Sequence, residues 1–285
     1  MMEVFTMTER ILTMKHVQEF YQHLVREEKS HVTIAKYYRD AQTFLRFTEG
    51  KAVTREMVIA YKNSLMERAY AVRSINSMLA GMNSLFSFMG WNDYRVKSIR
   101  MQRQIYSAEE KELTKAEYMR LLDASRANEQ LNLVLQTICG TGIRVSELRY
   151  FTVESVKTGE VTVDCKNKTR TILVPGRLKS LLLSFAKRRK ITAGAIFITR
   201  SGKNLDRSNI WSSMKKLCNA ANVKASKVFP HNLRKLFART FYCLEKDIAK
   251  LADILGHSSI NTTRIYIMTT GVEHRRKIER LGLVV

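Results

Sequence analysis

The chain has 285 residues, of which 45% are hydrophobic, so it is long enough for two domains with buried cores and too apolar to be disordered. Its 49 Lys and Arg against 26 Asp and Glu give a formal net charge of +23, which favours nucleic acid as the partner over a ribosomal or membrane-surface role. The sequence contains no run of about eighteen apolar residues and no signal-peptide core, so we expect a cytoplasmic protein without a membrane span. It also contains no C-x-x-C pair, so we expect neither a zinc site nor a disulfide framework.

The N-terminal part predicts a small all-α bundle of four helices. Apolar residues recur at helical spacing in residues 15–29, 31–48 and 74–89, and in a segment from 57 to 65 that Thr54 can cap. Short loops join these segments, and Gly90 closes the last one, as is typical of helical bundles. Six basic residues between the apolar stripes predict one surface that meets a DNA backbone: Lys36, Arg39, Arg46, Lys62, Arg68 and Arg73.

Residues 92–112 have no clear period, are mostly polar and are basic from 95 to 103. We therefore expect a helical domain over residues 1–92, a DNA-crossing linker over 93–112 and a second domain over 113–285. The plain alternative for the linker is an ordered extension of the bundle.

The second domain is expected to be mainly helical with a small sheet. A Thr114–Glu117 capping box starts a helix, and a buried helix around Val134 ends near Gly142. Alternating apolar residues at 161–163 and 172–174 predict a β-hairpin with a basic turn. Three further elements are expected, namely an amphipathic helix over 178–190, a short buried strand over 195–199, and a helix over 209–222 capped by Asp206 or Ser208.

Arg144 is expected at the start of the helix that follows Gly142, where free backbone N–H groups and a guanidinium together make an anion site. Glu147 lies one turn later and can pair with Arg144 and hold it in place.

Residues 229–266 hold a cluster of candidate active groups: His231, Arg234, His257, Arg264 and Tyr266. Pro230 suits the first turn of a helix, on which residues 231 and 234 share a face. A second helix over 247–255 ends at Gly256, and a third over 262–266 ends on the tyrosine. Arginine binds phosphate, histidine moves protons near neutral pH, and tyrosine can act as a nucleophile, so the cluster indicates covalent phosphoryl transfer.

Three motifs resemble those of the tyrosine recombinases, also called the phage integrase family: TGIRVSEL at 141–148, HNLR at 231–234 and LGHSSINTTRIY at 255–266. Lys235 departs from the pattern, because many relatives carry a second His there. The resemblance implies a four-helix, SAM-like core-binding domain on the opposite side of DNA from an α+β catalytic domain. Because the bundle begins by about Met14, the chain looks like the simple Xer-like type, without an arm-binding domain.

Relatives also place a catalytic lysine in the hairpin, in a pattern like K-G-N-K-x-R. The corresponding K-N-K-T-R in this chain is one residue shorter. Alignment from the left makes Lys166 the catalytic lysine, and Lys168 is the alternative.

By this resemblance, Tyr266 attacks a scissile phosphate, forms a 3′-phosphotyrosyl bond and releases a 5′-hydroxyl. Arg144, Arg234 and His257 stabilise the transition state, Lys166 protonates the leaving oxygen, and His231 deprotonates the tyrosine or binds phosphate. No cofactor or metal is implied.

The implied partner is double-stranded DNA with specific recombination sites, bound by a homo-tetramer in a nucleoid-associated, bacterial setting. Integration, excision, inversion and resolution all stay open.

Residues 271–285 are expected to dock on a neighbouring protomer, and the alternative is that they fold back on their own domain. The competing functions are type IB topoisomerase-like relaxation and DNA binding without catalysis.

Overall fold

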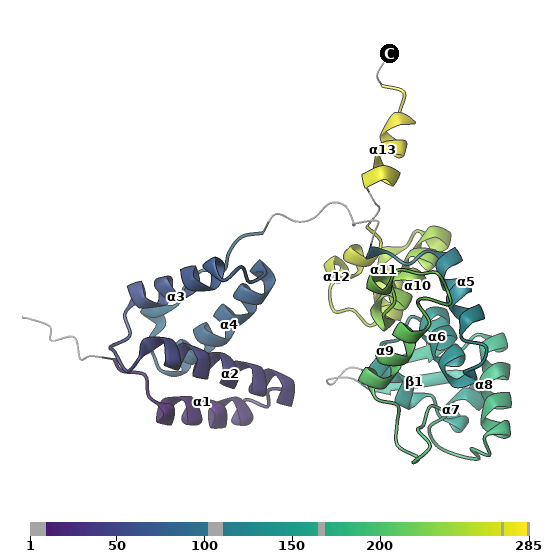
Figure 1. Ribbon diagram of the computed structural model, residues 1–285, viewed down its shortest axis with the longest axis horizontal. Helices are drawn as coiled ribbons and strands as arrows, with labels where there is room; N and C mark the ends of the chain where they lie inside the picture. Colours follow the sequence, from purple (N-terminus) through teal and green to yellow (C-terminus); the bar gives the residue numbers. More distant parts are fainter. Residues whose placement is uncertain (1–9, 102–110, 165–168, 269–270, 284–285) are drawn as a thin grey trace, which may run out of the picture. The chain divides into compact units, whose positions relative to one another are not determined.

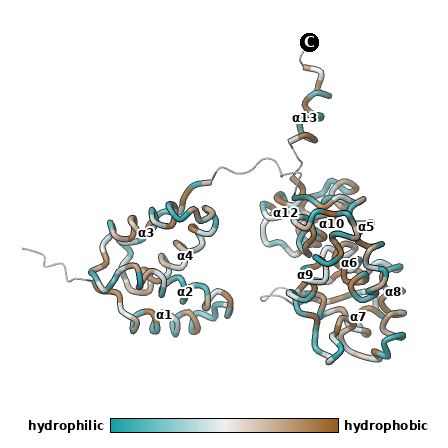
Figure 2. The backbone as a smooth tube through the Cα atoms, in the orientation of Figure 1, coloured by the Kyte–Doolittle hydropathy of each residue, from teal (hydrophilic) through white to brown (hydrophobic). Residues whose placement is uncertain are grey.

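The computed structural model of the chain divides into two compact units, residues 1–103 and 104–285 (Figure 1). The structure describes residues 10–101, 111–164, 169–268 and 271–283. Each unit has its own core of buried apolar residues. Hydrophobic and hydrophilic residues alternate along most helices, as expected for helices that bury one face (Figure 2).

Four α-helices form the N-terminal unit: α1 Met14–Arg26, α2 His31–Thr48, α3 Arg55–Glu67 and α4 Val72–Phe88. A short 3-10 helix, Asn92–Tyr94, follows α4. The side chains of Thr13, Ser30 and Thr54 cap the first three by accepting backbone N–H groups, which agrees with the sequence prediction for Thr54. Helix α2 packs against α1 and α4 around fully buried Phe20 and Phe44.

Lys36 and Lys62, which are among the six cations expected to face DNA, donate hydrogen bonds to backbone carbonyls of the bundle. Lys36 pairs with buried Asp40 and donates to the Ser77 carbonyl at 2.8 Å. Lys62 donates to the Lys97 carbonyl at 2.9 Å. Their charges serve the fold of this unit.

Residues 93–99 correct the predicted linker boundary, because they pack along α4 as an extension of the bundle. Asn83 exchanges two hydrogen bonds with the Val96 backbone, at 2.9 and 3.1 Å, and Asn76 does the same with Ile99, at 2.9 and 2.8 Å. An asparagine amide offers a donor and an acceptor in the arrangement of a peptide group, so each pairs with the extended segment as a neighbouring strand would. The sequence of residues 93–99 does not indicate this packing, because the hydrogen-bond partners of their backbone are Asn76 and Asn83 on α4.

The second unit contains, in chain order, α5 Lys115–Ala124, α6 Glu129–Thr141, the 3-10 helix Val145–Tyr150, α7 Val153–Thr158, β1 Glu160–Asp164, β2 Thr169–Leu173, α8 Gly176–Arg188, α9 Arg207–Lys216, the 3-10 helix Ala225–Lys227, α10 Pro230–Glu245, α11 Ile248–Leu255, α12 Ile260–Tyr266 and α13 Gly271–Glu279. Strands β1 and β2 pair antiparallel, with Val161 opposite Ile172. The expected fold, mainly α with a small sheet, is confirmed. Among the described helices, none combines the length and hydropathy needed to cross a bilayer.

The strand predicted over residues 195–199 is wrong. Only single bridges join Ala195 to Thr152 and Ile198 to Asn204, while Ile196 and Phe197 fill the core at 0% and 1% exposure. The apolar run reflects burial of a loop, which sequence alone does not separate from a strand.

Two helix boundaries also differ from the prediction. Asp206 caps α9 by accepting from the Ser208 N–H at 2.8 Å, but the helix ends at Lys216 and turns follow. Helix α12 begins at Ile260, earlier than expected, because Ser259 caps it.

Candidate active site

Helix α10 carries the most buried charged group of the site, Arg234, whose side chain is 1% exposed. Its guanidinium donates to the carbonyl of Leu255 at 2.6 Å, to the carbonyl of Gly142, and to Nε2 of His257 at 3.0 Å. One buried donor of this arginine, its Nε, lacks a hydrogen-bond partner among the described residues.

Tyr266, at the end of α12, is 7% exposed and lies between two imidazoles. The ring centroids of His231 and His257 are each 5.0 Å from its ring, and both stand nearly perpendicular to it, at 88° and 85°. The guanidinium carbon of Arg234 lies 5.9 Å from the tyrosine ring centroid. The structure thus brings together four of the five groups singled out in residues 229–266, and the fifth, Arg264, is exposed on α12.

Glu147 organises the cationic side of the site. Its carboxylate, 2% exposed, accepts from the Arg144 backbone N–H at 2.7 Å and from the Arg144 guanidinium at 3.1 Å. The predicted pairing of residues 144 and 147 is confirmed, although a 3-10 helix follows Arg144 instead of an α-helix. The Arg144 side chain stays 41% exposed, so it is held in place and still open to a ligand.

Arg170 on β2, the last residue of the K-N-K-T-R pattern, is a further site residue to which the sequence analysis gives no role. It donates to Glu147 at 2.5 Å and to the Ile254 carbonyl at 2.6 Å. Its Cδ would lie 2.7 Å from a Cβ at Gly256, where φ is +63°. Glycine is required at 256 both by its backbone angle and by this close approach.

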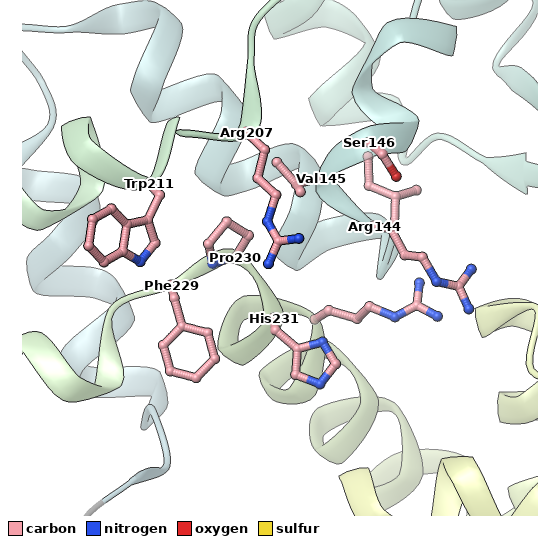
Figure 3. A pocket seen from close by; sticks show the side chains of 10 residues that line it. Arg144, Val145, Ser146, Arg207, Trp211, Phe229, Pro230 and His231 are labelled. Atoms are coloured by element: carbon pink, nitrogen blue, oxygen red, sulfur yellow. The ribbon is translucent and has the colours of Figure 1, made fainter. Parts of the chain in front are cut away.

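A pocket of about 330 Å³ opens beside these groups. Arg144, Arg207 and His231 point toward it from three different elements, and Trp211 and Phe229 form its aromatic side (Figure 3). Arg207 and Trp211 lie on α9, whose sequence shows only an ordinary capped helix and gives no signal of a site. A polycationic pocket of this size suits a phosphate group and its immediate surroundings.

The cations shape the protonation of the site. Burial and then Arg234 lower the pKa of His257 to about 4, and burial, Lys235 and Arg234 lower the pKa of His231. Burial and Arg144 lower the pKa of Arg234 to about 10, which leaves it charged at neutral pH. Both imidazoles are therefore neutral at pH 7. Below pH 6.5 the unfolded chain binds a proton on His257 that the folded chain does not bind until about pH 4. The contribution of His257 to the free energy of unfolding is therefore lost as the pH falls from 6.5 toward 4.

Lys166 and Lys168 lie outside the described residues, whose nearest members are the paired Asp164 and Thr169 at the ends of β1 and β2. In the described ranges, no group of three or more His, Cys, Asp or Glu side chains is arranged to hold a metal ion.

Two family models match the chain. The phage integrase family matches residues 111–271, and the phage integrase N-terminal SAM-like domain matches residues 17–92. Tyrosine recombinase XerA from Pyrococcus furiosus is 29% identical over 290 residues, covering 98% of each protein.

Solved structures share the fold. The crystal structure of XerA recombinase gives a TM-score of 0.54 at 22% identity and covers 95% of this chain and 99% of that one. A lambda integrase tetramer bound to a Holliday junction gives 0.69 at 16% identity, with coverages of 88% and 76%.

The site gathers a tyrosine, two histidines and a buried arginine next to a cationic pocket. Because the integrase match spans more than half of its length, the chain belongs to the phage integrase family, the tyrosine recombinases. The resemblance seen in its motifs is confirmed, and with it the class of site-specific DNA recombinase.

We predict that Glu147→Gln lowers the rate of DNA cleavage by on the order of tenfold or more, because two arginines lose the buried charge that holds them. Single-turnover cleavage of a nicked substrate measures this. Glu129→Gln is the matched control, since Glu129 pairs with Arg188 at the surface, with side-chain exposures of 48% and 56%. Equal cleavage by both variants would contradict the organising role of Glu147.

Proposed function

We propose that Tyr266 is the nucleophile of this recombinase. Its oxygen attacks the scissile phosphorus, an O–P bond forms, and the bond from phosphorus to the 5′ oxygen breaks. The product is a 3′-phosphotyrosyl bond that keeps the energy of the phosphodiester, so the free 5′-hydroxyl of a partner strand can rejoin it. The placement of Tyr266 between two imidazoles and beside Arg234 supports this most directly.

Arg144, Arg234 and His257 form the group that stabilises negative charge on the non-bridging oxygens. Removing a comparable preorganised donor typically costs roughly 3–4 kcal/mol of transition-state stabilisation. The exposed guanidinium of Arg144 is a donor that a phosphate can use.

His231 accepts the proton of Tyr266. A neutral imidazole is required for that step, and the lowered pKa of His231 keeps it neutral at pH 7. Its ring lies 5.0 Å from the tyrosine ring, centroid to centroid. A lysine of the β1–β2 hairpin, which we assign as Lys166, gives a proton to the leaving 5′ oxygen.

The Xer-like, two-domain type is favoured because XerA matches along nearly the full length of both chains. Recombination between defined sites is therefore preferred to topoisomerase-like relaxation. The six-residue set of Arg144, Lys166, His231, Arg234, His257 and Tyr266 is present in full, which argues against a silent relative. An enzyme of this kind acts on DNA in the cytoplasm; the relatives include archaeal proteins, so bacterial origin stays a prediction.

The N-terminal bundle is assigned as the core-binding domain, and the active assembly as a homo-tetramer on two duplexes. Lambda integrase, which shares the fold, forms a tetramer on a Holliday junction. In the described part of the C-terminal segment, residues 271–283, four large apolar side chains are exposed: Val272 at 51%, Ile278 at 53%, Leu281 at 61% and Leu283 at 82%. Docking on a neighbouring protomer would bury them, and such head-to-tail contacts can close into a ring.

Tyr266→Phe should abolish the covalent protein–DNA adduct while DNA binding stays nearly unchanged, because other residues contact the phosphate. Denaturing gels of a nicked suicide substrate measure the adduct, and gel shifts measure binding. Tyr242→Phe is the control, because this half-buried tyrosine lies on α10 beside Lys246. An adduct that persists in the Tyr266 variant would exclude it as nucleophile.

Lys166→Ala should slow cleavage strongly, and a 5′-phosphorothiolate at the scissile bond should restore it, because a thiolate leaves without protonation. The same pair of substrates tested on Lys168→Ala decides between the two lysines. Rescue of the Lys168 variant, and not of the Lys166 variant, would reverse the assignment.

Deletion of residues 281–285 should leave binding to a single site intact and lower recombination by on the order of tenfold, the cost of losing an apolar interface anchor. Leu244→Ser is the matched control, since Leu244 is an 81% exposed apolar residue on α10 outside this segment. Gel shifts and a two-site recombination assay give the two readouts. Full recombination by the truncated protein would rule out docking.

A further inference from the structure

His257 has a partner at each ring nitrogen. An Nη2 of Arg234 lies 3.0 Å from its Nε2, and the Thr263 hydroxyl oxygen lies 2.8 Å from its Nδ1. Thr263 is 0% exposed and stands on α12, three residues before Tyr266. The chain of contacts therefore runs from the nucleophile's own helix to the buried arginine.

The chemistry of the partners fixes the proton on this ring. A guanidinium has donors and no acceptor, so Nε2 must accept with its lone pair. The ring proton of a neutral imidazole then sits on Nδ1 and is donated to the Thr263 oxygen.

The two other forms of the ring are disfavoured. The Nε2–H tautomer would place two donors face to face across 3.0 Å. An imidazolium would do the same and would add a positive charge beside Arg234, Arg144 and Arg170, the three arginines that already lower the pKa of His257.

We propose that Thr263 is a positioning residue that holds His257 in the Nδ1–H form, so that the Nε2 lone pair fixes the Arg234 guanidinium next to Tyr266. This inference rests on the proposed role of Tyr266. In this arrangement His257 contributes to the charge-stabilising group of the proposed function by holding Arg234 in place.

Thr263 can orient the His257 ring because α12, and not the histidine, fixes the position of the threonine. Residues 263 and 266 lie three apart on α12 and are both buried, so they share the inner face of one helix turn. The orientation of His257 is thereby tied to the helix that carries the nucleophile. A side chain of the same shape without the hydroxyl would leave a buried N–H unpaired.

The first test reads the proton directly. Nitrogen NMR of the full chain, labelled with ¹⁵N in histidine and assigned with His257→Gln, distinguishes a protonated from an unprotonated ring nitrogen. At neutral pH we expect protonated Nδ1 and unprotonated Nε2 in the wild type and in Thr263→Ser, and loss of this pattern in Thr263→Val. A protonated Nε2 in the wild type would overturn the proposal.

The second test is kinetic. Thr263→Val should slow formation of the Tyr266 adduct by on the order of ten- to a hundredfold, the effect of one unpaired buried donor on the active arrangement. Thr263→Ser should restore the rate, and Thr262→Val, at an exposed neighbour on α12, should leave it unchanged. Wild-type speed in Thr263→Val would overturn the positioning role. If the wild type forms no Tyr266 adduct, the proposed function fails, while the NMR result still decides the tautomer.

Discussion

The burial of one guanidinium, that of Arg234, is the constraint on which the catalytic unit depends. An arginine that is 1% exposed keeps its charge and is costly to bury unless acceptors surround it. Those acceptors are the carbonyls of Gly142 and Leu255, at the C-terminal ends of α6 and α11. The last carbonyls of a helix lack intrahelical partners and carry the negative end of its dipole. The guanidinium of Arg234 therefore supplies hydrogen bonds to carbonyls at the ends of both helices, and these carbonyls supply the acceptors that the buried guanidinium requires.

This convergence explains two glycines. Gly142 and Gly256 end α6 and α11 in the left-handed conformation, at φ +66° and +63°. A Cβ at Gly142 would lie 2.3 Å from Phe237, and one at Gly256 would lie 2.7 Å from Arg170. Each glycine lets a helix stop where its carbonyls reach the arginine and lets a neighbouring side chain close over the turn. At either position, a residue with a Cβ would be strained in the left-handed conformation and would clash with the neighbouring side chain.

Local signals in the sequence were sufficient for much of the fold. Periodicity and capping residues such as Thr54 and Thr114 place most helices, because these are short-range effects within one or two turns. The motifs also identified His231, Arg234, His257 and Tyr266, which the structure gathers. These residues could be found early because each lies in a stretch whose residue types and spacing are distinctive.

The failures share a different cause, which is dependence on distant partners. Arg170 becomes a site residue only through Glu147, on a different element, and Arg207 only through the pocket that α9 forms with α10 and residues 143–146. The apolar run at 195–199 is buried by other elements without strand pairing, and residues 93–99 are ordered by asparagines of α4. In each case the contact that determines the structure joins residues far apart in the sequence, and the spacing of apolar residues gives no information about such contacts.

The electrostatics of the site then follow from its composition. Arg144, Arg170 and Arg234 surround a single buried carboxylate, Glu147, in the described part of the site. Positive charge therefore exceeds negative charge, and burial together with this excess lowers the pKa of both histidines and keeps them neutral. In the proposed function, a phosphodiester brings the missing negative charge, and its charge increases as the oxygen of Tyr266 adds to phosphorus. Under that proposal, the excess of positive charge stabilises the reacting phosphate most at the point where its negative charge is greatest.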